Sequence, residues 1–140
     1  MGTNISGWVE VKVWKNQKDW LSYHEIPWHR DYRVYAMLAN VRNENLKIPF
    51  ISNPKGLPKD IHAGTKYEYD EEVKNGVKWE SWVTAGELYS YLFDNPDFLI
   101  QHKDETKSVA PMWVAFIHYI LELGKLYGMD NVRIVIWFNP

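Results

Sequence analysis

The stretch Val132-Arg-Ile-Val-Ile-Trp-Phe138 decides the fold. Its even-numbered positions carry Val, Ile, Ile and Phe, and its odd-numbered positions carry Arg, Val and Trp. Because side chains alternate between the two faces of a strand, both faces of this segment are largely apolar. A strand that is apolar on both faces is typical of the interior of a sheet. We therefore expect an inner strand over residues 132–138.

A second strand is predicted where Trp8 to Trp14 reads Trp-Val-Glu-Val-Lys-Val-Trp. The three valines fall on one face, and Glu10 and Lys12 fall on the other, which predicts one solvent-facing side. We expect this strand and the strand over 132–138 to belong to one sheet. The segment Trp20 to Ile26 can return beside the first strand as part of a meander.

Two helices are predicted from the residues that begin them. Asp31 can cap a short amphipathic helix, in which the apolar residues between Val34 and Val41 recur with a 3.6-residue period. Thr84-Ala-Gly-Glu87 has the pattern of a capping box, which predicts a helix that ends near Phe93.

A third and longer helix is predicted between Ser108, as its cap, and Gly128, as its stop, with Pro111 in the first turn. The segment from Ile48 to Asp60 contains three prolines and is predicted to be a loop. The pattern as a whole predicts an α+β fold: an antiparallel sheet that includes the N- and C-terminal strands, covered on one face by two or three helices.

The length and composition exclude several classes of protein. With 140 residues, 46% of them hydrophobic, the chain is expected to form one domain over residues 1–140. A net charge of −2 argues against a DNA or RNA partner, and the absence of cysteine excludes disulfides and thiolate metal sites. No signal-like start or apolar run of membrane-spanning length is recognised, so we expect a cytoplasmic protein without a membrane partner.

Aromatic residues are unusually frequent: 8 Trp, 9 Tyr and 5 Phe make up 16% of the chain. Several lie on predicted helix and strand faces, where core packing explains them: Trp113, Phe116, Trp137 and Phe138. Four others lie at element ends or in loops and remain candidates for binding: Trp28, Tyr32, Trp79 and Trp82.

Catalytic and metal-binding motifs are not recognised in the sequence. The five histidines lack metal-ligand spacing, so we predict no metal, no cofactor and no catalytic set. His24 and His29 are the histidines that could act as general bases, but a pair of surface loop histidines is the more ordinary interpretation. The acidic run from Glu68 to Glu72 could attract a cation, but a solvated helix or loop face is the more ordinary interpretation.

An arginine-rich cluster suggests a binding function instead. The run His29-Arg-Asp-Tyr-Arg33 is followed by Arg42-Asn43 after the short predicted helix, and then by Lys55 in the loop. Guanidinium groups bind phosphate oxygens in bidentate geometry, and aromatic rings stack on nucleobases. The alternative is a set of surface arginines paired with Asp31, Asp60 or the acidic run.

The order of several segments resembles a family of small, mostly uncharacterised phage and prophage proteins that open with Met-Gly-Cys/Thr-Asp-Ile-His and a Val-Glu strand. The corresponding segments here are Met1–Glu10, Arg30–Tyr32, Leu38–Asn43, Lys55–Asp60, Ser81–Leu88 and Val132–Asn139. They follow one another in register along nearly the whole chain. The resemblance implies a viral protein acting in the cytosol of a bacterial host.

This chain departs from the family pattern at polar positions. Where relatives carry Asp and His in the opening and His before the Ser-Trp segment, it has Asn4, Ser6, Trp79 and Glu80. The substitutions remove an acid and the imidazoles that could have bound a metal or served as general bases, and the side chains that remain can donate, accept and stack. The resemblance thus implies a homo-oligomeric counter-defence protein that sequesters a nucleotide immune signal, such as a cyclic ADP-ribose or a cyclic dinucleotide, without chemistry.

The ligand-binding residues expected for that function fall into three chemical roles. Phosphate groups would be bound by Arg30, Arg33, Arg42 and Lys55. Ribose or base edges would be bound by Asn4, Ser6 and Asn43. Stacking would be provided by Tyr32, Trp79 and Trp82.

Two other functions remain open from the sequence. A phosphodiesterase or hydrolase could cleave such a signal, with His24 or His29 as the general base and an arginine stabilising the developing charge. A protein-binding inhibitor of a host enzyme could use an exposed aromatic patch and need no pocket.

Overall fold

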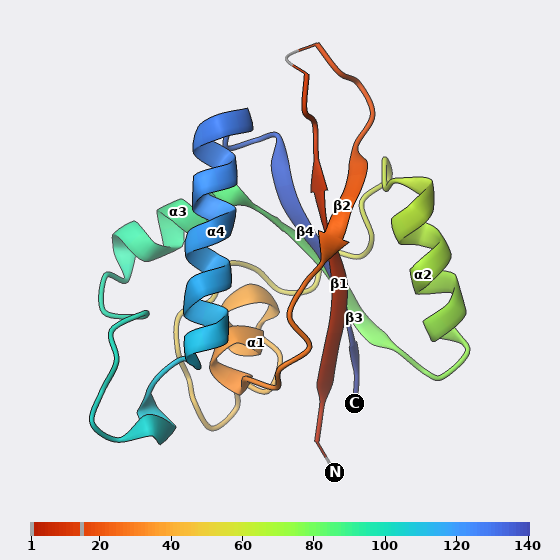
Figure 1. Ribbon diagram of the computed structural model, residues 1–140. Helices are drawn as coiled ribbons and strands as arrows, with labels where there is room; N and C mark the ends of the chain where they lie inside the picture. The colour runs from red at the N-terminus through yellow and green to blue at the C-terminus, as the bar shows by residue number, and fades with distance from the viewer. Residues whose placement is uncertain (1, 15) are drawn as a thin grey trace.

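The computed structural model describes residues 2–14 and 16–140 (Figure 1). The elements follow the order β1 (Asn4–Val11), β2 (Leu21–Glu25), α1 (Tyr32–Ala39), α2 (Ala63–Val73), β3 (Lys78–Thr84), α3 (Ala85–Asp94), the short 3-10 turn η1 (Glu105–Lys107), α4 (Pro111–Tyr127) and β4 (Val132–Asn139). This order confirms the predicted α+β class.

The sheet has four antiparallel strands in the order β2-β1-β4-β3. β1 and β4 pair along their whole length, from Asn4 opposite Asn139 to Val11 opposite Val132. The prediction of an inner strand over 132–138 is therefore confirmed, as is the meander formed by β1 and β2. The strand predicted over 8–14 is displaced, because it begins at Asn4 and ends at Val11.

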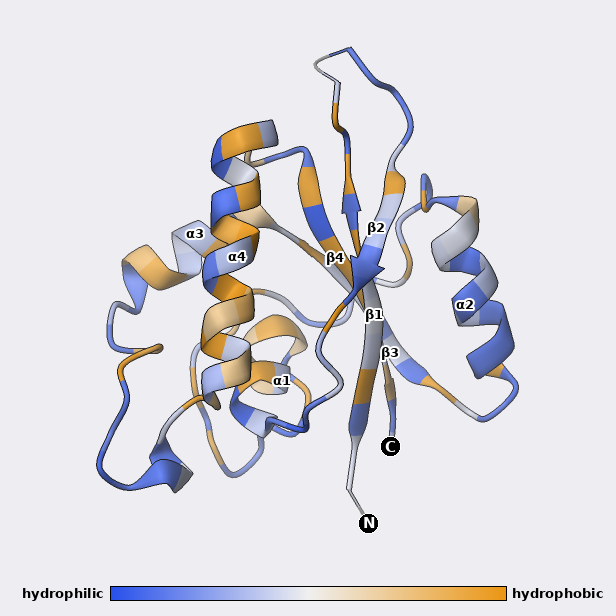
Figure 2. Cartoon of the chain, viewed as in Figure 1, coloured by the Kyte–Doolittle hydropathy of each residue, from blue (hydrophilic) through white to orange (hydrophobic). Residues whose placement is uncertain are grey.

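Helices cover both faces of the sheet (Figure 1). α1, α3 and α4 cover one face and agree with the three predicted helices. α2 covers the opposite face and was not expected, because it lacks an apolar stripe and buries only Thr65 among its residues. Figure 2 shows α2 mainly in the hydrophilic colours, in contrast to α1.

The face of β1 that was predicted to be solvated is in fact buried. Glu10 has no exposed surface, and Arg133, opposite it on β4, is 2% exposed. Arg133 Nη2 lies 2.6 Å from Glu10 Oε1, and its Nη1 lies 2.9 Å from Asp60 Oδ1. The alternation separates the two faces of β1, but it does not reveal that α2 and the loop before it cover the charged face.

The predicted caps are confirmed for two of the three helices. Asp31 accepts hydrogen bonds from the backbone of α1, and Thr84 forms a complete capping box with Glu87. The prediction for Ser108 is wrong, because the N-cap of α4 is Ala110 and the Ser108 hydroxyl accepts a hydrogen bond from the backbone of His102 instead. Gly128 ends α4 as expected, with φ of 109°.

Among the described residues, the segment Glu105–Tyr127, which ends with α4, has the length and apolar composition that would allow a membrane span. Its buried side chains, which include Trp113, Ile117 and Ile120, are part of the hydrophobic core between the helices and the sheet. Core packing therefore accounts for its apolar character.

Candidate functional site

Part of the predicted binding cluster comes together where the start of β1 meets α1. The backbone N–H of Thr3 donates to the hydroxyl of Tyr32 at 3.1 Å. Arg42 Nε donates to Thr3 Oγ1 at 2.9 Å, and its guanidinium group lies 4.9 Å from the centre of the Tyr32 ring. These contacts fix both the tyrosine ring and one cationic group at the corner.

Arg30 reaches the same corner from the segment before α1. Its Nη2 donates to Asn4 Oδ1 at 2.8 Å. Its guanidinium group also packs against Gly2, where a Cβ atom would lie 1.9 Å from Arg30 Nη1. A side chain at position 2 would therefore displace the Arg30 guanidinium group from this position. Asn4, Arg30, Tyr32 and Arg42 are therefore neighbours, as the binding hypothesis requires.

A cleft of about 570 Å³ lies beside this corner. One wall is the run His29 to Arg33, and the opposite wall comes from the segment that leads into α4, including Glu105, Thr106 and Ser108. Arg33 Nε points to the carbonyl of Thr106 at 3.5 Å, a long contact that leaves most of its donor capacity unused. The cleft thus has arginines from one wall available to an occupant.

The charges of the cleft are not balanced by local ion pairs. Within residues 2–14 and 16–140, neither Arg30 nor Arg33 forms an ion pair with a carboxylate. The nearby Asp31 carboxylate is committed to three backbone N–H groups, those of Arg33, Val34 and Ala110. The predicted alternative, surface arginines paired with Asp31 or the acidic run, therefore does not describe Arg30 and Arg33.

The far wall is ordered by its own hydrogen bonds. Asp104 accepts from the backbone and hydroxyl of Thr106 at 3.0 and 2.7 Å. The side-chain and backbone hydrogen bonds from Thr106 lower the pKa of Asp104. Trp113 supports the near wall, since its indole N–H donates to the carbonyl of His29 at 2.7 Å.

Trp79 lies at the same end of the sheet but outside the cleft. Its ring centre lies 6.4 Å from that of Phe138. The ring centres of Phe138 and Tyr35 are 5.2 Å apart, and those of Tyr35 and Tyr32 are 5.5 Å apart. Trp79 lies where the pairing of β3 with β4 is interrupted. Its backbone is left-handed, with φ of 57°, and so is that of Arg42, with φ of 58°. Left-handed backbone is unfavourable for such residues, so the surrounding contacts hold both in place.

Four predicted residues lie elsewhere. Asn43 is a structural residue that bonds both the N–H and the carbonyl of Ile48 within its loop. Lys55 pairs with Glu87 at 3.2 Å and lies 3.7 Å over the Trp82 ring. Ser6 lines a small cavity on the opposite face of the sheet. The sequence analysis grouped these residues by their type and order along the chain, but the topology separates them in space.

The structure also adds residues that the sequence analysis missed. Thr3 joins Tyr32 to Arg42, and Gly2 admits Arg30. Thr106 and Glu105 complete the cleft from a polar segment that carries no recognisable motif. For Gly2 and Thr3, their position beside Asn4 was the available signal, whereas the far wall depends on the tertiary fold.

Of the two histidines considered as general bases, one lies at the cleft. His29 lines the cleft. His24 Nε2 lies 3.0 Å from the hydroxyl of Tyr119, away from the arginines. Among the residues that the structure describes, no group of three or more His, Cys, Asp or Glu residues could hold a metal ion.

Comparison with protein-family models, with curated proteins and with solved structures finds no match for this chain.

Proposed function

We propose that this protein binds a phosphate-bearing nucleotide in the cleft beside Arg30 and Arg33 and sequesters it without chemical change. The observation that carries the proposal is that Arg30 and Arg33 both line this cleft and that neither forms an ion pair with a carboxylate of residues 2–14 or 16–140. Charged donors of this kind bind phosphate oxygens more strongly than neutral donors do.

The roles of the corner residues follow from their placement. Arg30 and Arg33 bind phosphate oxygens, while Tyr32 provides a ring whose position is fixed by Thr3 and Arg42. Asn4 orients Arg30 through the 2.8 Å hydrogen bond and offers an amide to a ribose or base edge. The left-handed backbone of Arg42 supports a functional assignment, because strained residues cluster at binding sites.

Binding rather than cleavage is favoured by the state of the local acid. The two oxygens of Asp31 accept three backbone hydrogen bonds, so this carboxylate is occupied as a structural group. The resemblance to phage proteins extends the proposal to a counter-defence role in the cytosol of a bacterial host. In that role the ligand is an immune signal of the cyclic ADP-ribose or cyclic dinucleotide type, and the protein is a homo-oligomer.

The test is to mix the purified protein with a panel of such nucleotides, remove the free ligand, denature the protein by heat and identify what is released by mass spectrometry. Recovery of intact nucleotide is expected. Arg33→Gln should bind at least about tenfold more weakly, because a charge-assisted contact contributes roughly 1.5–3 kcal/mol. Lys125→Gln is the matched control, since Lys125 pairs with Glu122 on α4, outside the cleft.

Other outcomes would contradict the proposal in distinct ways. Release of a cleaved nucleotide would show a hydrolase, with His29 as the first residue to test for general-base action. Retention of no nucleotide from the panel would overturn sequestration and leave the protein-binding inhibitor. Light scattering coupled to size exclusion tests the oligomeric state separately.

A further inference from the structure

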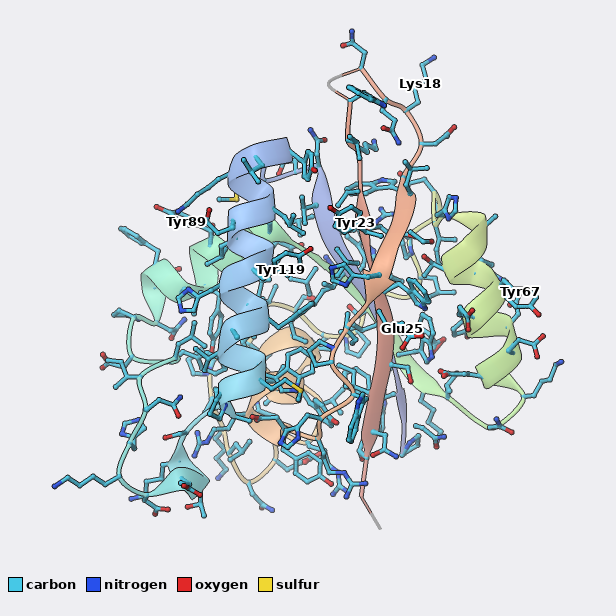
Figure 3. All side chains as sticks on the ribbon, in the orientation of Figure 1. Lys18, Tyr23, Glu25, Tyr67, Tyr89 and Tyr119 are labelled. Atoms are coloured by element: carbon cyan, nitrogen blue, oxygen red, sulfur yellow. The ribbon has the colours of Figure 1, made fainter. Side chains whose placement is uncertain are left out.

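A second, smaller cavity lies on the opposite face of the sheet, between β1, the end of β2 and α2. Its volume is about 80 Å³. Three indoles and three carboxylates dominate its lining: Trp8, Trp28, Trp137, Glu25, Glu68 and Glu72. Figure 3 labels Glu25, which lies at the end of β2 on the side of the sheet that α2 covers.

One indole and one carboxylate of this cavity are held rigidly. Trp137 is 1% exposed, and the edge contact with Tyr69 places the two ring centres 5.3 Å apart. The indole N–H of Trp137 donates to Glu72 Oε2, which fixes the carboxylate beside the ring. The hydroxyl of Tyr69 in turn donates to Glu80 at 3.1 Å. This wall is therefore formed before any ligand enters.

Among residues 2–14 and 16–140, the carboxylates of the cavity form no ion pair. Glu68 and Glu72 are one helical turn apart on α2, a spacing at which like charges repel. The lysines of α2 are used elsewhere, since Lys66 pairs with Asp70 and the C-cap residue Lys74 pairs with Glu71. Within residues 2–14 and 16–140, no ion pair involves Glu25, Glu68 or Glu72.

The indoles also lack the cations that other rings of this protein have. Lysine or arginine side chains lie over the rings of Tyr32, Tyr69, Trp20 and Trp82. Across the described part of the chain, no such contact is made to the three indoles of the cavity. Trp28 at its rim is 79% exposed, the highest value among the large apolar side chains described. An occupant of the cavity would cover part of this ring.

We propose that this cavity binds a small alkylammonium ion. The faces of the indoles attract the cation through their quadrupoles, and the carboxylates supply the opposite charge. Anions are excluded by the same charges, so the site is chemically distinct from the arginine cleft and does not depend on the nucleotide proposal. The small volume selects a compact head group rather than a large ligand.

The test follows the indole N–H signals of the ¹⁵N-labelled protein during titration with tetramethylammonium chloride or methylammonium chloride. Saturable shifts are expected for Trp8, Trp28 and Trp137, with little change at Trp113 on the opposite face. Sodium chloride at equal ionic strength and tert-butanol, an uncharged branched probe, should produce no saturable shift. A preference between the two ammonium ions distinguishes an aromatic cage from a carboxylate hydrogen-bonding site. Shifts with neither ion, or equal shifts with tert-butanol, would overturn the proposal.

Matched variants on one helix assign the effect to the cavity. Glu68→Gln should weaken ammonium binding by roughly tenfold, as expected when one partly desolvated charge is lost. Glu71→Gln is the control, because Glu71 lies on the same helix outside the cavity and pairs with Lys74. Trp28→Ala should also weaken binding while leaving the unfolding temperature nearly unchanged, since its ring is largely exposed. Equal affinities in all three variants would contradict the assignment.

Discussion

The Asp31 carboxylate accepts a hydrogen bond from the backbone N–H of Ala110 at 2.7 Å, across 79 residues of sequence. Its other oxygen caps α1 by accepting from Arg33 and Val34. Since the N-cap of α4 has no side-chain cap of its own, one aspartate holds the starts of two helices together. The same residue forms part of the arginine cleft.

Asp31→Ala is therefore expected to destabilise the protein by about 1–3 kcal/mol, because it removes the cap of α1 and leaves the Ala110 N–H without its acceptor. Urea unfolding followed by circular dichroism measures the change. Asp31→Asn keeps one carbonyl acceptor and should lose less. A substitution to Ala that costs no more than the substitution to Asn would contradict the double role.

Replacement of Arg133 should have a larger effect. Arg133→Met leaves Glu10 buried without its cationic partner, which is expected to cost about 3–5 kcal/mol. Glu10→Gln in the same background removes the isolated charge and should recover part of this loss. Equilibrium unfolding of both variants provides the measurement, and an Arg133→Met protein as stable as the parent would refute the importance of this pair.

Asp60, which also pairs with Arg133, makes the free energy of unfolding depend on pH. Burial alone would raise the pKa of Asp60, but the hydrogen bond and charge of Arg133 and the hydrogen bond from Trp20 lower the pKa below its ordinary value of 3.8. A lowered pKa in the folded state means that the stabilisation is present above pH 3.8 and is lost as the pH falls further. The contribution is small, because the Asp60 side chain is 60% exposed.

This dependence is measured by comparing the parent protein with Asp60→Asn between neutral pH and about pH 2. The difference between their free energies of unfolding should shrink as the pH falls through this range. A constant difference at every pH would show that the charge of Asp60 does not contribute.

Two buried tyrosines give different expectations for removal of the hydroxyl. The Tyr35 hydroxyl is buried and has no hydrogen-bond partner among the residues described, whereas the Tyr91 hydroxyl donates to the carbonyl of Pro49 at 2.7 Å. Tyr91→Phe should destabilise the protein by about 1 kcal/mol, and Tyr35→Phe should cost less, because no hydrogen bond of normal geometry is lost. Thermal unfolding of both variants tests the contrast, and equal losses in the two variants would contradict it.

The same two residues predict a loss of stability in alkaline solution. Burial raises the pKa of Tyr35 and of Tyr91 from 10.0 to about 12. Because the unfolded chain loses these protons first, the free energy of unfolding should fall as the pH rises from about 10 to about 12. Absorbance titration should show a late-ionising fraction that is reduced in each Phe variant. Ionisation of all tyrosines near 10 in the folded protein would contradict the burial effect.

Arg42 provides a separate test of the proposed nucleotide site. Arg42→Ala should weaken phosphate-dependent binding by roughly 1.5–3 kcal/mol, since it removes a charged donor and releases Thr3 and Tyr32. Calorimetric titration with the nucleotide that the protein retains gives the affinity, and Arg42→Lys separates loss of charge from loss of geometry. Unchanged affinity in a folded Arg42→Ala protein would remove Arg42 from the site.

The sequence predicts those parts of the fold that depend on local pattern. The inner strand β4, the cap at Asp31 and the capping box at Thr84 follow from alternation and from side chains that bond nearby backbone groups. α2 escapes such analysis because its residues are mostly polar and it buries only Thr65. Likewise, the alternation in β1 reveals the two faces but does not show that Glu10 would be covered.

The sequence likewise predicts the proximity of only some residues of the candidate site. Arg30, Tyr32 and Arg33 are adjacent in sequence, and Arg42 follows one short helix later, so their proximity could be expected. Lys55 and Trp82 depend on where β3 and its preceding loop lie, and they form a separate contact with Glu87. Sequence order alone does not contain that placement.

The pairing of Glu10 with Arg133, which are 123 residues apart, has a consequence for the order of folding. β1 lies between β2 and β4, so until residue 133 has been synthesised its inner edge lacks β4 and its buried carboxylate lacks its cationic partner. Closing so long a loop is slow compared with forming a helix or hairpin. During translation the first strands would therefore remain an open hairpin, and the finished sheet would assemble around the strand that emerges last.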